Sequence, residues 1–197
     1  MVNTFNWDEL MHAWNRLILS GHLQQVIEPD LVRRGWLGRA GATDEQIEEL
    51  ENRIGLTLPP SYRTFLQYSN GWLGRLDVFI YKLYSTEEVV WFYERNQNEI
   101  DGWVRVDTPP TSPEAHRIYG TQQNVRLFRA QYLQTAIQIS DWGDASLLLL
   151  TPEVVHEEEW EAWFLASWLP GALRYRSFWE LMNSRFQAFR NNYQNEM

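Results

Sequence analysis

The stretch between Thr43 and Gly71 constrains the fold most, because it carries start and stop signals for two successive helices. Thr43 and Gln46 have the spacing of a capping box, in which each side chain accepts a hydrogen bond from the backbone N–H of the other residue. Gly55 supplies the left-handed residue that ends this first helix. Pro60 has no backbone N–H, but the N–H groups in the first turn of a helix have no partner within the helix. A second helix can therefore start at Pro60 and stop before Gly71. The stretch therefore predicts two short consecutive helices.

The rest of the chain predicts helices at both ends with strands between them. Apolar residues recur every three or four positions in the terminal segments, as in amphipathic helices, and cluster or alternate in short central segments, as in strands. The expected elements are an opening helix from Trp7 to about Ile27, strands at 76–80, 136–140, 146–150 and 160–164, and a last helix capped by Ser177. The polar stretch 94–124 predicts a long excursion with one short strand at 103–106. This order indicates an α+β fold, with helices packed on one face of a mostly antiparallel sheet.

The length of the chain favours one domain. A chain of 197 residues can bury about 70% of its unfolded surface in one core, so neither a disulfide nor a metal is needed to hold it folded. The chain contains no cysteine, which excludes disulfides, cysteine-ligated zinc, iron–sulfur clusters and a thiol nucleophile. We expect a single domain over 1–197, with an N-terminal helical extension at 1–34 and a core at 35–190.

Charge and hydropathy indicate where the chain acts and what it binds. The net charge of -9 argues against nucleic acid as a partner, since phosphate binding depends on clusters of Lys and Arg. A cationic protein is a better candidate. The opening residues lack the basic and apolar regions of a secretory signal, and the apolar run at 147–150 is far shorter than the ~20 residues that span a bilayer. We therefore expect a cytoplasmic protein that does not contact the membrane.

The sequence lacks the common catalytic and metal-binding motifs. His156 is followed by three glutamates and then by Trp160, where the second histidine of a zinc-protease motif would stand. The other histidines have no ligand spacing. Neither a Gly-x-Ser-x-Gly elbow nor a glycine-rich phosphate loop is present. We therefore expect no catalytic residue, no metal site and no cofactor.

Two acidic clusters are candidates for a binding surface, although the ordinary interpretation of each cluster alone is a solvated face. The first contains Asp44, Glu45, Glu48, Glu49 and Glu51, and the second contains Glu153, Glu157, Glu158, Glu159 and Glu161. In a strand, alternation would place the glutamates at 157, 159 and 161 on one solvated face, beside buried tryptophans. The tryptophans at 160, 163 and 168 also leave open an enzymatic interpretation, in which two carboxylates flank a sugar bound on aromatic rings.

A resemblance to a known family is carried by the run GATDEQIEELENRIGLTLPPSYRTFLQYSNGW. It contains a capped helix, Leu-Pro, a Tyr-x-x-Phe-Leu helix and Asn-Gly in succession. In these features the chain resembles the SUKH superfamily, which includes fungal Smi/Knr regulators of cell-wall synthesis and many bacterial immunity proteins. The matching residues are Ile47, Glu51, Gly55, Leu58, Pro59, Tyr62, Phe65, Leu66, Asn70 and Gly71. The similarity extends from about Gly35 to Phe186, with one departure at Thr151, where the family more often has Asn before the proline.

The resemblance implies a single domain of helices against one antiparallel sheet, with no catalytic residues to carry over. For a bacterial member it implies an immunity protein that neutralises a toxin, often a nuclease, and for a fungal member a regulatory scaffold. The leading hypothesis is an immunity protein whose acidic surface blocks a cationic toxin domain. A regulatory scaffold of cell-wall synthesis comes second, and a carbohydrate-binding module or glycosidase third. The candidate partner-binding residues are Glu157, Glu158, Glu159, Trp160, Glu161 and Trp163.

Overall fold

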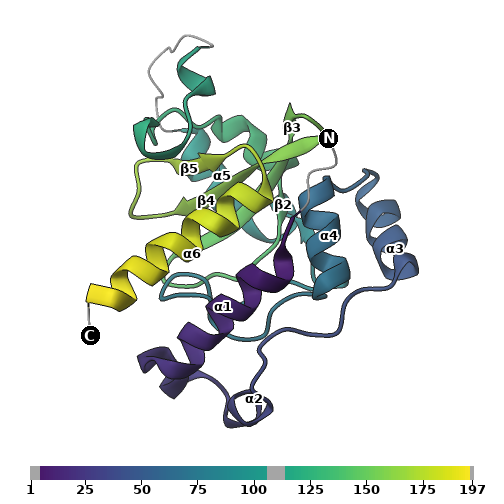
Figure 1. Ribbon diagram of the computed structural model, residues 1–197. Coiled ribbons are helices and arrows are strands. Elements are labelled where there is room, and N and C mark those ends of the chain that lie inside the picture. Colours follow the sequence, from purple (N-terminus) through teal and green to yellow (C-terminus); the bar gives the residue numbers. More distant parts are fainter. Residues whose placement is uncertain (1–4, 106–113, 196–197) are drawn as a thin grey trace.

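The computed structural model describes residues 5–105 and 114–195, and it has the α+β fold that the sequence predicts (Figure 1). The α-helices are α1 (Trp7–Ser20), α2 (Pro29–Arg34), α3 (Asp44–Ile54), α4 (Pro60–Tyr68), α5 (Tyr93–Val104) and α6 (Phe178–Asn195). The strands are β1 (Val90–Trp91), β2 (Ile137–Gln138), β3 (Ser146–His156), β4 (Glu159–Ala166) and β5 (Ala172–Tyr175). Short 3-10 helices are η1 (His22–Val26), η2 (Ala115–Arg117), η3 (Gly120–Gln122) and η4 (Ala130–Thr135). In these ranges no helix combines the length and apolar character needed to cross a membrane.

The strands form one antiparallel sheet in the order β1-β2-β3-β4-β5. The two longest strands, β3 and β4, pair along a hairpin that runs from Ser146 opposite Ala166 to His156 opposite Glu159. The structure confirms the strands predicted at 136–140, 146–150 and 160–164, which fall in β2, β3 and β4.

Side chains cover both faces of the sheet. Leu148 and Phe164 lie in the cluster formed with α1, α4 and α6, whereas Leu147 and Trp163 lie in a second cluster with α5 and η4. In Figure 1, α6 crosses one face of the sheet with α1 beside it. α5 belongs to the stretch predicted as a polar excursion, yet its Ile100 is buried in the second cluster. A strand buried on both faces has a continuous apolar sequence, which explains the four leucines at 147–150.

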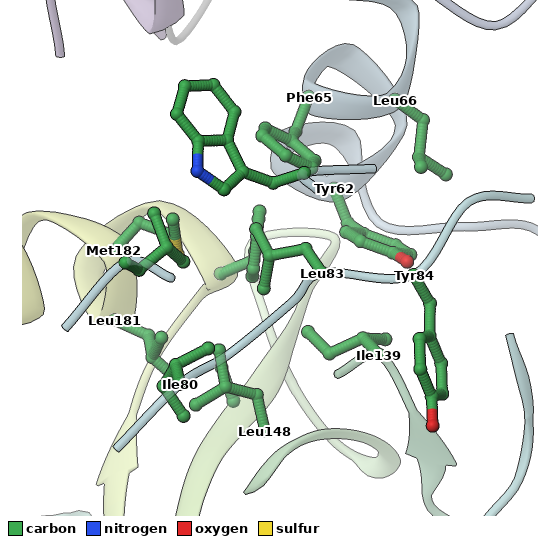
Figure 2. Close-up of a cluster of buried hydrophobic side chains, with 14 of the residues drawn as sticks. Tyr62, Phe65, Leu66, Ile80, Leu83, Tyr84, Ile139, Leu148, Leu181 and Met182 are labelled. Atoms are coloured by element: carbon green, nitrogen blue, oxygen red, sulfur yellow. The ribbon is translucent and has the colours of Figure 1, made fainter. Parts of the chain in front are cut away.

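The N-terminal helix α1 is part of the main core. Trp14 is fully buried and its indole N–H donates a hydrogen bond to the carbonyl oxygen of Leu76 at 2.7 Å. The Trp7 ring packs against Phe65 of α4 and Trp179 of α6, with centroid distances of 5.2 and 4.7 Å. Figure 2 shows part of this core between the helices and the sheet. Side chains of α4 lie there near those of α6 and of the sheet region: Tyr62, Phe65 and Leu66, then Leu181 and Met182, then Ile139 and Leu148. α1 thus shares one hydrophobic cluster with α3, α4, α6 and one face of the sheet.

The local signals around α3 and α4 are confirmed. The N–H of Gln46 donates to Oγ1 of Thr43 at 3.3 Å, and the N–H of Thr43 donates to Oε1 of Gln46 at 3.0 Å. Gly55 follows α3 with a φ of 71°, and α4 begins at Pro60. The short connection between the two helices is therefore fixed at both ends.

Three predicted elements differ from the structure. No strand forms at 76–80, because Asp77 accepts hydrogen bonds from the N–H groups of Phe79 and Ile80, each at 2.8 Å, and so folds the segment into a tight loop. The opening helix ends at Ser20, and the 3-10 helix η1 follows it. The short strand predicted at 103–106 is wrong for its described part, because α5 continues to Val104. Position 106 lies outside the described residues.

Candidate partner-binding surface

The hairpin tip between β3 and β4 presents two adjacent carboxylates. Glu157 and Glu158 form a two-residue turn with φ values of 49° and 72°. Left-handed residues at both positions match the twist of an antiparallel hairpin, although non-glycine residues adopt this conformation at some cost. Both side chains are exposed, and neither has an ion-pair partner among the described residues.

Glu159, the next residue, turns inward and caps a helix. Its carboxylate accepts hydrogen bonds from the N–H of Ser61 at 2.7 Å and from the Ser61 hydroxyl at 2.5 Å. Pro59 precedes α4 and gives it no side-chain cap, so the carboxylate from β4 satisfies a helix amide that has no local acceptor. Burial and the charge of Glu158 raise the pKa of Glu159, and the two hydrogen bonds from Ser61 only partly offset them.

Glu161 is the centre of a second internal network. Its Oε1 accepts a hydrogen bond from the Trp163 indole and its Oε2 accepts one from the Tyr119 hydroxyl, both at 2.7 Å. The guanidinium of Arg174 lies 3.8 Å from the same carboxylate, and both side chains are almost fully buried. Burial and the hydrogen bond to Glu161 raise the pKa of Tyr119, so this hydroxyl keeps its proton and remains a donor. The network stabilises the packing of the segment around Tyr119 against β4 and β5.

Only two of the six candidate residues therefore lie on the surface. Glu157 and Glu158 are exposed, whereas Glu159, Trp160, Glu161 and Trp163 are 4%, 6%, 1% and 1% exposed. The expectation of a solvated row of glutamates is wrong at 159 and 161, and the two tryptophans are core residues that a partner cannot contact directly. The expectation assumed that one face of this strand is solvated. Instead, α4 binds Glu159, the segment around Tyr119 binds Glu161, and α5 and η4 cover Trp163.

The acidic cluster on α3 adjoins the same region of the fold. Glu48 and Glu49 are exposed and, within the described ranges, have no ion-pair partner. Glu51 accepts a hydrogen bond from the N–H of Leu58 at 2.8 Å. Leu58 lies in the connection between α3 and α4, just before the first turn of α4, where Ser61 binds the capping carboxylate of β4. We call Glu48, Glu49, Glu157 and Glu158 the acidic end; Glu45 and Glu153, at the start of α3 and on β3, are also exposed and have no ion pair among the described residues.

Two further features shape the acidic end, and the charge pattern alone did not indicate them. An open groove of about 440 Å³ lies beside α3, lined by Glu48, Glu51, Asn52, Gly55, Leu56 and Thr57. Val155, on β3 just before the tip, is 56% exposed and offers an apolar contact next to the carboxylates. Asp44 and Glu51 are less available to a partner, because both lie within 4 Å of the Arg63 guanidinium, at 3.6 and 2.9 Å. Glu153 and Val155 lie on the same exposed face of β3, because residues two apart in a strand share a face, and an exposed valine gives no signal in the sequence.

The fold and this surface define an α+β domain whose buried carboxylates bind groups of its own core and whose free carboxylates face solvent. A model of the SMI1 / KNR4 family (SUKH-1) matches residues 41–189. The match covers most of the chain, and the chain belongs to this family, as the sequence resemblance predicts. α1 and α2 lie before the matched region. A search of curated proteins found no match.

Proposed function

We propose that this chain is a non-catalytic binding protein, acting in the cytoplasm as an immunity protein against a bacterial nuclease-type toxin. The observation that carries the proposal is the acidic end, where four carboxylates face solvent without ion-pair partners among the described residues. A nuclease is positively charged where it holds phosphate, so complementary potentials would speed the encounter and select this partner. Membership of the SUKH family supports a binding role, since the bacterial proteins that the chain resembles are immunity proteins.

The internal hydrogen bonds of Glu159 and Glu161 weaken the glycosidase alternative. A glycosidase needs two carboxylates that face one bound sugar. Here Glu159 binds Ser61 at the start of α4, whereas Glu161 binds Trp163 and Tyr119. Both carboxylates are engaged with different parts of the protein, so the residues that suggested sugar chemistry stabilise the fold. The regulatory-scaffold alternative needs no complementary charge, and the salt dependence of binding separates it from the immunity role.

The test is co-expression of the chain with candidate nuclease toxin domains, followed by binding kinetics at several salt concentrations. In the variant with Glu48, Glu49, Glu157 and Glu158 all changed to Lys, we expect protection to be lost. We also expect the association rate constant to fall by about 10-fold to 1000-fold, because steering by complementary charge contributes this much. Each pair changed alone should give an intermediate loss.

A matched control changes the same kind of charge elsewhere. Glu99→Lys with Asp101→Lys alters two exposed acidic residues of α5, which packs on the other face of the sheet. We expect this double variant to bind and protect like the wild type. If the quadruple variant protected fully and kept the wild-type salt dependence, the acidic end would not be the binding surface.

A further inference from the structure

A groove of about 500 Å³ runs between α1 and α6. The two helices lie next to each other and run in the same direction (Figure 1). Two contacts show this: Trp7 packs on Trp179 with a centroid distance of 4.7 Å, and Trp14, later in α1, packs on Phe186, later in α6, at 5.5 Å. α1 lies outside the region that matches the SUKH family. One wall of the groove therefore lies before the matched region, and the other wall, α6, lies mostly within it.

The floor of the groove is apolar. Leu10 and Phe186 are buried there, and Ala13, Leu17 and Trp179 are partly exposed. Ala13 stands between the larger side chains of α1, so another helix could approach closely at this point. A partly exposed apolar floor of this kind gains free energy when it is covered.

Charged residues stand at the two ends of the groove, and their signs differ. Glu9 lies at the end where α1 and α6 begin, and Arg16 and Arg190 lie at the opposite end. None of the three has an ion-pair partner in the part of the chain that the structure describes. The Arg190 guanidinium lies 5.9 Å from the Phe186 ring centroid, which holds it at the edge of the groove. One carboxylate and two guanidinium groups give the groove a net charge of +1, against -9 for the whole chain.

We propose that this groove is covered by the same groove of a second copy of the chain, in an antiparallel two-fold dimer. Glu9 and Arg16 are about two helical turns apart, roughly 10 Å along α1. A two-fold axis near Ala13 therefore brings Glu9 opposite the partner's Arg16, and the same contact recurs on the other side of the axis. Glu9 and Arg16 face opposite charges on the second copy only when the two copies of α1 run antiparallel. The groove also carries only a small net charge, so two copies of this strongly acidic protein meet there with less repulsion than across an acidic surface.

This inference does not depend on the proposed immunity role, because the groove and the acidic end use different elements. The test measures self-association of the full chain by sedimentation equilibrium over a range of concentrations. We expect a monomer–dimer equilibrium in the wild type. Glu9→Arg alone or Arg16→Glu alone should weaken dimerisation by about tenfold, since each change turns two attractive contacts into two repulsive ones.

The decisive variant combines Glu9→Arg with Arg16→Glu, because the swap restores opposite charges across the axis. We expect it to dimerise more tightly than either single variant. A matched control, Glu28→Arg with Arg126→Glu, swaps two exposed charges outside the groove and should dimerise like the wild type. Circular dichroism confirms that every variant is folded. A wild type that stays monomeric at the highest soluble concentration, or a swap no better than the single variants, would overturn the proposal.

Discussion

At the scale of single residues, Glu159 shows how one buried carboxylate can take a structural role in place of a functional one. It caps α4 across a sequence separation of 98 residues. The positive end of a helix favours a carboxylate at this position. Burial, however, disfavours the ionised form, and the neighbouring charge of Glu158 adds to the effect. The balance leaves the pKa of Glu159 above its ordinary value, which makes the capping contact sensitive to pH.

This shift predicts how Glu159→Gln changes the pH dependence of stability. Glutamine keeps an acceptor for the Ser61 N–H and removes the ionisable group. Because the folded protein raises the pKa of Glu159, the contribution of this group to stability is complete below its unfolded pKa and is lost as the pH rises through the folded value. We therefore expect the free energy of unfolding of the wild type, relative to Glu159→Gln, to fall as the pH rises above about 4, the ordinary pKa range of a glutamate. Urea unfolding at a series of pH values measures it.

Two further variants test the cause of this pH dependence and the role of Glu159 as a hydrogen-bond acceptor. Glu158→Gln removes the neighbouring charge and should reduce the fall, because the pKa of Glu159 then moves toward its ordinary value. Glu159→Ala leaves Ser61 without its acceptor and should cost about 1–3 kcal/mol. A stability difference between the wild type and Glu159→Gln that stayed constant with pH would contradict the assigned cause.

At the scale of elements, the segment from η2 through Val125 covers the open edge of β5. The Gln123 side chain imitates a neighbouring strand, since its amide nitrogen donates to the Arg174 carbonyl oxygen at 3.1 Å and its oxygen accepts from the Arg174 N–H at 2.7 Å. The N–H of Ala172 donates to the Val125 carbonyl oxygen at 3.1 Å. Open strand edges invite pairing with other chains, so this cover protects the sheet from edge-to-edge association.

Gln123→Ala tests the cover directly. The Arg174 N–H loses its acceptor, and we expect its hydrogen exchange to become faster while the amides of the β3–β4 pairs keep their protection. Gln122→Ala is the matched control, because Gln122 is exposed and adjacent in η3. Exchange at Arg174 that was equal in the two variants would show that the side-chain amide does not hold the edge.

Arg174→Met tests the network that ties the same segment to the core. Arg174 lies 3.8 Å from Glu161 and donates to the carbonyl oxygens of His116 and Ile118 at 2.7 and 3.1 Å. Removing it leaves a buried carboxylate without its cation, which should cost about 3–5 kcal/mol. Combining it with Glu161→Gln should cost less than the sum of the two single changes, since the uncompensated charge is then absent. Additive losses in urea unfolding would contradict a coupled pair.

The elements that could be predicted from the sequence are those fixed by local chemistry. The capping box at Thr43 and the glycine at 55 act within a few residues, so α3 appears where the pattern places it. The segment at 76–80 has the same alternation as a strand, but the Asp77 carboxylate binds the nearby amides and is in turn bound by Arg185 of α6. α5 was missed because its sequence is mostly polar and only a few residues, such as Ile100, reach the core.

At the scale of the whole molecule, the acidic end could be predicted in charge but only partly in position. The sequence analysis placed the glutamates at 157, 159 and 161 on one solvated strand face, and Glu157 and Glu158 are indeed exposed, although they form the turn between β3 and β4. Glu159 and Glu161 are buried because α4 and the segment around Tyr119 reach them from distant parts of the chain. The approach of the α3 cluster to the same region also depends on long-range packing. Which carboxylates remain free is therefore a property of the tertiary structure.

The packing of α1 predicts that the molecule unfolds as one unit, although α1 lies outside the matched family region. Trp14 is fully buried against α6 and its indole binds Leu76, so Trp14→Ala removes both apolar contacts and a hydrogen bond. We expect a loss of about 3–5 kcal/mol, with tryptophan fluorescence and far-ultraviolet circular dichroism giving coincident urea transitions. Gln24→Ala, an exposed change in η1 just after this helix, should stay within about 0.5 kcal/mol of the wild type. Two separate transitions, with α1 lost first, would instead mean that α1 is an independent attachment to a self-sufficient domain.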